Sequence, residues 1–194
     1  FRNEGSDPSH VQEFTQIEFY VAYKDYEWNM DFTEKFLRDV LQKTFGTLQF
    51  EVIGKTGAKH TIDLSQPIPR YRLTDLIKQK PGIDVLEFDN ASDLLAAMKS
   101  RGIEVEDAEN KGLGTLVDEL YKHTVRPELI APMFLTNHTA DMLPLARRNS
   151  EDPRLVDSFQ FIIAGWELIK AYSELVDPVD QRDRMVRQSE FREA

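Results

Sequence analysis

Apolar and polar residues alternate along residues 13–23. Because successive side chains of a strand point to opposite faces, this period of two predicts a half-buried strand. Its apolar face carries Ile17 and Phe19, and its polar face carries Glu18 and Tyr20. The pattern therefore predicts a strand whose polar face offers a carboxylate and a phenol.

The next segment has helical spacing. Asp31 and Glu34 form a capping-box pattern, in which each side chain accepts a hydrogen bond from the other residue's backbone N–H. Apolar residues then recur every three or four positions as far as Gly46, and glycine commonly ends a helix. We therefore expect a helix from Asp31 to Gly46. Residues 47–53 and 61–64 are expected to pair as a hairpin.

The rest of the chain favours short helices followed by strands. Helices are expected at residues 73–79, 94–100 and 113–124, the second capped by Ser92. Together they form a predicted small helical insertion over approximately residues 70–125. Strands are expected at residues 131–135, 159–164 and 168–175, and a charged helix at 180–194. Strands without regular helix alternation favour an α+β fold, in which an antiparallel β-sheet is flanked by helices.

Composition narrows the class of protein. The chain has 194 residues, of which 41% are hydrophobic, as expected for one globular domain. Its net charge of −10 argues against nucleic-acid binding through bulk electrostatics alone. A nucleic-acid partner contacted by another part of a longer protein remains open.

The absence of cysteine bears on the cellular compartment of the protein. The chain has no cysteine, which excludes disulfides and thiolate chemistry and suits a cytoplasmic protein. No apolar run approaches the roughly 20 residues that span a bilayer, so we expect no membrane partner.

The chain begins with Phe1 rather than Met, which suggests a piece of a longer protein.

A second predicted strand carries a tyrosine and a glutamate on one face, as the strand with Glu18 and Tyr20 does. In KAYSEL, the side chains of Lys170, Tyr172 and Glu174 share one face of the predicted strand. Placed beside Glu18 and Tyr20, they would form a cleft with carboxylates and aromatic walls. Such a cleft suits a small cation with an apolar stem. The alternative is an ordinary solvated face.

The start of the chain holds a polar cluster of Arg2, Glu4 and His10. Arg2 can clamp a carboxylate or a phosphate through two hydrogen bonds. His10 and Phe14 can pack against a planar ring. The alternative is a polar loop without a ligand.

Two further groups are candidates for binding metal or phosphate. Gln160 and Glu167 lie on either side of the break at Gly165, where a carboxylate can bind Mg²⁺ beside a nucleotide. One carboxylate with one amide is also compatible with a purely structural pair. Arg147 and Arg148 would contact phosphate or RNA, or form surface ion pairs.

The order of these pieces resembles the class II aminoacyl-tRNA synthetases. FRNEG at 1–5 and EFTQIEFY at 13–20 look like their second signature motif. GLGTLVDEL at 112–120, PLARRN at 144–149 and the GWEL…YSEL…DP run at 165–178 are similar to the lysyl-tRNA synthetases. The resemblance extends over the whole chain.

The resemblance implies that residues 1–194 are a partial catalytic domain, from the second signature motif to just before the third. ATP and L-lysine would give lysyl-adenylate, with Mg²⁺ at the phosphates, and lysine would then pass to tRNA(Lys). The full-length protein would be a homodimer. The isolated residues are expected not to charge tRNA, because the first and third motifs lie outside them.

Motif positions also imply roles at the nucleotide. Arg2 would be the catalytic residue, binding the α-phosphate and the carboxylate of lysine. Glu4 would contact the adenine amino group, His10 the triphosphate end, and Phe14 the face of adenine.

The lysine site is implied in the same way. Glu18 would contact the α-ammonium group, and Tyr20 and Glu174 the ε-ammonium group. Tyr172 would line the aliphatic stem, and Lys170 lies beside this pocket.

Several positions depart from the family pattern. Ser9 stands where an arginine is usual, and Gln160 where a second metal-binding glutamate is expected beside Glu167. Lys170 replaces a usual asparagine, so its ammonium group would repel the substrate or replace a metal charge.

Two alternatives remain open. One is a paralogue that transfers lysine to a protein rather than to tRNA. The other is a non-catalytic binding or regulatory module that kept the fold. A synthetase of aspartate type is disfavoured, because Glu174 would repel an anionic substrate side chain.

Overall fold

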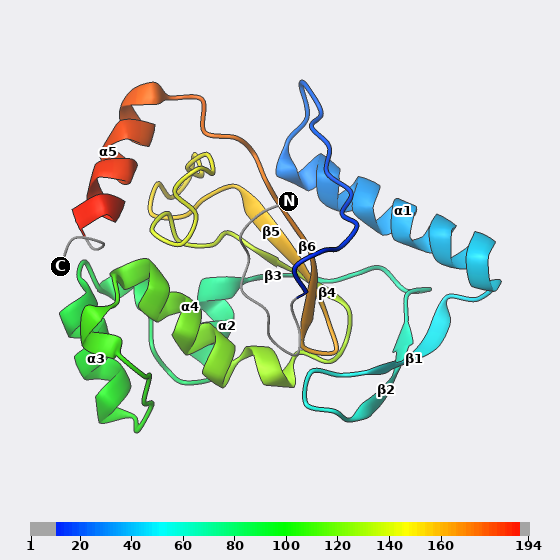
Figure 1. Ribbon diagram of the computed structural model, residues 1–194, viewed down its shortest axis with the longest axis horizontal. Coiled ribbons are helices and arrows are strands. Elements are labelled where there is room, and N and C mark those ends of the chain that lie inside the picture. Colours follow the sequence, from blue (N-terminus) through cyan, green and yellow to red (C-terminus); the bar gives the residue numbers. More distant parts are fainter. Residues whose placement is uncertain (1–10, 191–194) are drawn as a thin grey trace.

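A four-stranded sheet lies at the centre of the computed structural model, which describes residues 11–190 (Figure 1). Its strands, in spatial order, are β3 (Arg70–Arg72), β4 (Met133–Thr136), β5 (Ser158–Ile163) and β6 (Trp166–Tyr172). The pairs β4–β5 and β5–β6 are antiparallel, whereas β3 runs parallel to β4. The predicted α+β fold is confirmed, with one parallel edge strand in its sheet.

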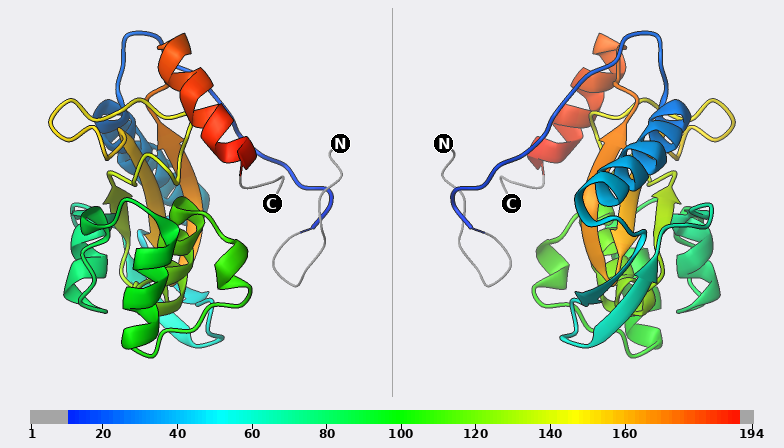
Figure 2. Two further views of the ribbon diagram at one scale, coloured as in Figure 1. Left: turned by 90° about the vertical axis from the view of Figure 1, so that its left-hand side faces the viewer. Right: turned by 90° about the vertical axis from the view of Figure 1, so that its right-hand side faces the viewer.

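Three short helices cover one face of the sheet (Figure 2). They are α2 (Leu73–Gln79), α3 (Ala91–Ser100) and α4 (Leu113–Thr124). They pack against Leu135 of β4 and Ile162 of β5 in one core cluster. The bounds predicted for α2 and α4 are confirmed, but α3 is capped by the side chain of Asn90 rather than by Ser92.

The region predicted as a helical insertion, residues 70–125, also contains a strand of the sheet. Because β3 pairs with β4, residues 70–72 belong to the sheet, and the helical layer begins at Leu73. Single 3₁₀ turns lie at Val85–Glu87, Ala108–Asn110 and Arg126–Glu128. That the helical layer is an insertion stays a prediction.

The opposite face is covered by α1 (Tyr26–Phe45) and the hairpin of β1 (Gln49–Ile53) and β2 (Lys59–Asp63) (Figure 2). The hairpin is as predicted. Phe134, Phe159 and Phe161 pack on this side together with Met30 of α1. The rings of Phe134 and Phe159 meet edge to face with centroids 5.3 Å apart, a favourable arrangement. Because neighbouring residues of β5 face opposite layers, the whole strand is buried.

Helix α1 begins earlier than the capping-box pattern predicts. The side chain of Asp25 accepts a hydrogen bond from the backbone N–H of Trp28 at 2.8 Å and caps the helix. Asp31 lies inside the helix and pairs with Arg70 instead. The predicted end at Gly46 is confirmed, since Gly46 has a left-handed φ of 69°. Neither α1 nor any other described helix is long and apolar enough to cross a membrane.

The strand predicted at residues 13–23 does not form. All of this segment is described, and no strand among residues 11–190 pairs with it. Its apolar side chains stay exposed, and Ile17 is 76% accessible. A period of two indicates extended backbone, whereas a strand also needs a partner for its N–H and C=O groups. Helix α1 follows this segment and begins at Tyr26, whose backbone N–H donates to Ser173 Oγ at 3.2 Å.

The β5–β6 hairpin contains a bulge that decides which side chains share a face. The chain turns at Ala164 and Gly165, both with positive φ. Gln160 lies opposite Lys170, but Ile162 lies opposite Glu167, because the register shifts between Phe161 and Ile162. The extra residue on β6 places Glu167 on the same face as Lys170. Simple alternation along β6 would put the two on opposite faces.

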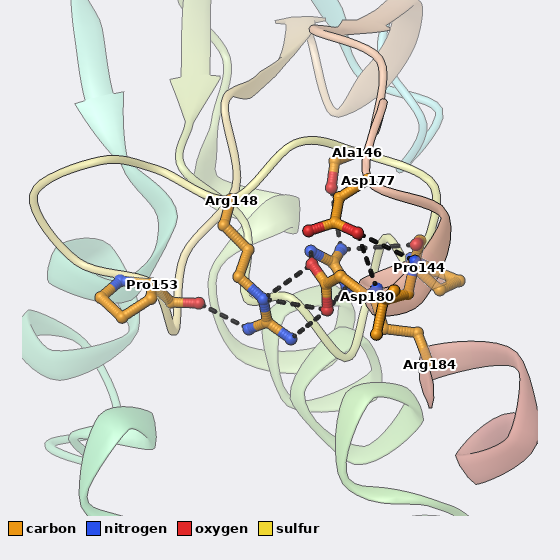
Figure 3. Close-up of polar contacts among 8 residues, drawn as sticks. Pro144, Ala146, Arg148, Pro153, Asp177, Asp180 and Arg184 are labelled. Carbon is orange, nitrogen blue, oxygen red and sulfur yellow. Dashed lines mark hydrogen bonds and ion pairs between the residues drawn. The ribbon is translucent and has the colours of Figure 1, made fainter. Parts of the chain in front are cut away.

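Helix α5 (Pro178–Glu190) is anchored by two arginines that share one carboxylate (Figure 3). Arg148 and Arg184 each donate to Asp180, with Nε to oxygen distances of 3.0 Å. Arg148 also donates to the carbonyl oxygen of Pro153 at 2.7 Å, and Arg184 to that of Ala146 at 2.8 Å. The Asp180 cluster, defined as Asp180 with Arg148 and Arg184, therefore connects α5 to the loop of residues 144–153.

The neighbouring Arg147 pairs with Asp157 at 2.8 Å. The sequence left two alternatives for Arg147 and Arg148, contact with phosphate or RNA and surface ion pairs. In the structure both side chains form ion pairs. This arrangement leaves few of their donors for a phosphate.

Gly114 in the first turn of α4 has no room for a side chain. A Cβ atom there would overlap the backbone carbonyl group of Asp141. Since backbone atoms cannot turn away, we expect Gly114→Ala to lower the free energy of unfolding by about 2 kcal/mol despite the better helix propensity of alanine. Chemical denaturation measures this change. Thr115→Ala in the same turn is exposed and serves as the control, and an equal loss in both variants would contradict the packing argument.

The Asp180 cluster predicts a pH-dependent stability. Hydrogen bonds from Arg184 and Arg148 hold the pKa of Asp180 well below its usual range. A lowered pKa stabilises the fold above the ordinary carboxyl pKa of about 4, and this contribution is lost as the pH falls further. We expect Asp180→Asn to cost about 2 kcal/mol of unfolding free energy at pH 7, because Arg184 is left buried without its anion.

The difference between wild type and Asp180→Asn should shrink as the pH is lowered from about 5 to about 2. Urea denaturation at a series of pH values measures it. Asp183→Asn changes an exposed carboxylate of the same helix and should leave the curve unchanged. A cost of Asp180→Asn that does not vary over this range would contradict the role of the ion pairs.

Candidate functional site

Four of the residues predicted to bind lysine lie together. Glu18 most strongly, and then Glu174, raises the pKa of Tyr20. Burial raises the pKa of Tyr172, with further contributions from Glu174, Tyr20 and Glu18. Such mutual effects require proximity. We call Glu18, Tyr20, Tyr172 and Glu174 the acidic aromatic cluster.

Backbone pairing beyond the end of β6 positions Glu174. The N–H of Ser173 donates to the carbonyl oxygen of Asp157, and the N–H of Arg147 donates to that of Ser173, both at 2.8 Å. The N–H of Leu175 donates to the carbonyl oxygen of Leu145 at 3.0 Å. The chain on both sides of Glu174 is therefore held, and its side chain continues the face of Tyr172.

The charge of the cluster is unbalanced within the described residues. Neither Glu18 nor Glu174 forms a salt bridge with a described lysine or arginine. Tyr20 is 75% exposed, whereas Tyr172 is partly buried against Ala146 and Val156. Two carboxylates beside two phenol rings can hold an ammonium group and pack its methylene stem.

The predicted metal pair, Gln160 and Glu167, is in direct contact. Gln160 is buried and donates from Nε2 to Glu167 Oε2 at 2.8 Å. Mg²⁺ prefers six oxygen ligands. The pair offers one carboxylate, because the amide nitrogen rather than its oxygen faces Glu167. Residues 11–190 contain no group of three acidic, histidine or cysteine side chains that could hold a metal.

These donors do not fit a divalent cation held by the described residues alone. Glu167 stays a predicted contact for a magnesium ion that a nucleotide carries. Lys170, predicted to lie beside the lysine pocket, is exposed and directly opposite Gln160 in the β5–β6 register.

His138 was not among the residues singled out from the sequence. It is 1% exposed, and its Nδ1 lies 2.9 Å from Ser158 Oγ. Burial lowers its pKa to about 4, so the ring is neutral at pH 7. Its position two residues after the buried strand MFLT is the one sequence signal of a buried polar group.

The predicted nucleotide contacts are only partly visible. Arg2, Glu4 and His10 lie outside the described residues. Phe14 is described and is 61% exposed, so its ring is accessible to a ligand. The roles predicted for these four residues stay predictions.

A cavity of about 720 Å³ lies between α4 and α5, away from the acidic aromatic cluster. Arg148, Arg154 and Arg184 line it. The guanidinium groups of these three already donate to carboxylates and carbonyl oxygens of the chain, and the one further arginine in the lining, Arg187, does not make a binding site by itself, so we assign this cavity no ligand. The acidic aromatic cluster is instead an open surface.

Comparison with known proteins agrees with the resemblance found in the motifs. The family model described as "tRNA synthetases class II (D, K and N)" matches residues 1–194. A lysine–tRNA ligase of Thermotoga maritima is 42% identical over 193 residues, which are 100% of this chain and 36% of the relative. One from Dehalococcoides mccartyi strain CBDB1 is 43% identical over 99% of this chain and 37% of the relative. One from Porphyromonas gingivalis is 39% identical over 100% of this chain and 32% of the relative.

The chain spans about a third of the length of these curated relatives. Because the family model covers every residue, this chain belongs to the class II tRNA synthetases of the D, K and N group.

Proposed function

We propose that this chain is the central part of the catalytic domain of a lysine–tRNA ligase, which joins L-lysine to tRNA(Lys) at the expense of ATP. The acidic aromatic cluster carries the proposal, because its two carboxylates lack a described cationic partner. The similarity to lysine–tRNA ligases over the whole chain supports it.

The chemistry of the cluster favours lysine over other amino acids of this synthetase group. A carboxylate attracts the side-chain ammonium group, and phenol rings pack its methylenes. An aspartate side chain would meet repulsion at Glu174 instead. Lys170 would repel the ammonium group of the substrate, so we place it at the border of the lysine pocket.

The proposed reaction has two steps. The carboxylate of lysine attacks the α-phosphorus of ATP and displaces pyrophosphate, and a ribose hydroxyl of the tRNA then attacks the activated carbonyl and displaces AMP. Positioning and charge stabilisation would supply the rate enhancement. Arg2 would hold the α-phosphate, Glu4 and Phe14 the adenine, and His10 the triphosphate end.

Magnesium would reach the site bound to the phosphates of ATP, and Glu167 would be its contact among the described residues. The net charge of −10 opposes binding of an RNA backbone, so we place most tRNA contacts outside these residues. We further propose that the full-length protein is a cytoplasmic homodimer.

Lysine-dependent exchange of pyrophosphate into ATP by the full-length protein tests this function. We expect exchange with lysine and none with aspartate or asparagine. Transfer of lysine to tRNA rather than to a protein separates the proposal from the lysine-transferring paralogue. Absence of exchange with lysine would contradict the proposal and leave the non-catalytic module.

Substitution of Glu174 tests the cluster itself. We expect Glu174→Gln to raise the KM for lysine by about 10- to 100-fold, since a hydrogen bond to a charged group contributes about 1.5–3 kcal/mol, while the KM for ATP stays nearly constant. Glu104→Gln is the control, because Glu104 is exposed on the helical side of the sheet. Equal effects on both substrates would indicate a structural rather than a lysine-binding role.

A further inference from the structure

A buried row of polar side chains lies behind the exposed edge of β6. Ser158 Oγ is 2.9 Å from His138 Nδ1, and Gln160 Nε2 donates to Glu167 Oε2 at 2.8 Å. His138 Nε2 and Gln160 Oε1 are both buried and have no hydrogen-bond partner among the described residues. Gln160 also raises the pKa of His138, which indicates that the two side chains lie close to each other.

The orientation of Gln160 follows from this row. A carboxylate only accepts hydrogen bonds, so the NH₂ group of Gln160 must face Glu167. Its carbonyl oxygen is then turned inward, toward the ring of His138, which is neutral and carries one proton. Turning that oxygen outward to bind a cation would break the bond to Glu167 and leave the NH₂ group buried without a partner. Gln160 therefore holds Glu167 in place.

Lys170 supplies a positive charge at the same edge. It lies directly opposite Gln160, and the bulge in β6 puts it on the same face as Glu167. Its side chain is exposed and forms no hydrogen bond or ion pair with another residue in the described range 11–190. Its charge lowers the pKa of His138, as expected for an ammonium group close to the buried row.

We propose that the ammonium group of Lys170 binds a phosphate of the nucleotide directly, and that Gln160 is the positioning residue that holds Glu167 beside it. An ammonium group repels the side-chain ammonium of a lysine substrate and attracts an anion, and the phosphates of ATP carry more negative charge than the single carboxylate of lysine. An ammonium group offers three donors on a flexible stem and is suited to phosphate as a point charge. Among residues 11–190, Glu167 is the one carboxylate at this edge and an NH₂ group is not a metal ligand, so these residues do not hold a divalent cation without the phosphates of the nucleotide.

This inference rests on the proposed use of ATP, and binding measurements on the full-length protein separate the two. The probes are a non-hydrolysable ATP analogue and adenosine, which lacks phosphate. We expect Lys170→Met to weaken binding of the ATP analogue about tenfold and to leave the affinity for adenosine unchanged. Lys170→Arg should keep most of the affinity for the analogue. Lys35→Met, an exposed lysine of α1, is the control and should change neither.

Unchanged affinity for the analogue in Lys170→Met would overturn the proposal, and so would an equal loss for adenosine, which indicates a structural effect. If Lys170→Met weakens binding of the analogue but the wild-type protein shows no lysine-dependent exchange of pyrophosphate into ATP, the proposed function fails and the phosphate contact stands. If exchange occurs and the analogue binds Lys170→Met as tightly as wild type, only the contact fails.

Manganese binding, followed by electron paramagnetic resonance, tests the second half of the proposal. Wild type with the ATP analogue should bind only the Mn²⁺ that the nucleotide carries. The double variant Gln160→Glu/Lys170→Asn restores a second carboxylate and removes the ammonium group, so we expect one additional Mn²⁺ per site. An additional Mn²⁺ already present in wild type would overturn the proposal.

Discussion

The antiparallel pairing of β5 with β6 is the contact on which the candidate site depends. It places Gln160 against Lys170, and its bulge brings Glu167 to the same face. Beyond the end of β6, backbone hydrogen bonds from Ser173 and Leu175 hold Glu174 in line with Tyr172. Because β5 is buried between two layers, this hairpin has a fixed platform, and the side chains that carry chemistry project from its exposed edge strand.

Charge is distributed along that edge in a way that matches two ligands of opposite sign. The acidic aromatic cluster has two carboxylates without a described cationic partner, and Lys170 has an ammonium group without a described anionic partner. An amino acid with a cationic side chain suits the first, and a phosphate suits the second. Glu167, held by Gln160, lies on the same face of β6 as Lys170. By contrast, the guanidinium groups of the Asp180 cluster donate their hydrogen bonds to groups of the chain itself.

Helices with a strong period and clear ends were predictable from sequence, as α2, α4 and the end of α1 at Gly46 show. The start of α1 was not, because Asp25 and Asp31 are both acceptable caps and only packing selects between them. Residues 13–23 have strand periodicity, but no described strand pairs with them, and periodicity cannot supply a partner. Tyr20 nevertheless lies near Glu18 and Glu174, although the expected strand did not form. The bulge in β6 and the buried His138 depend on three-dimensional contacts and left little trace in the pattern.

The central claim is that the acidic aromatic cluster recognises the ammonium group of a lysine side chain. Calorimetric titration of the full-length protein with L-lysine and with L-norleucine tests it most directly, because norleucine keeps the carbon chain and lacks the ammonium group. The account predicts that lysine binds at least about 100-fold more tightly, as expected for an ammonium group shared by a carboxylate and a phenol. Equal affinities for the two amino acids would contradict it.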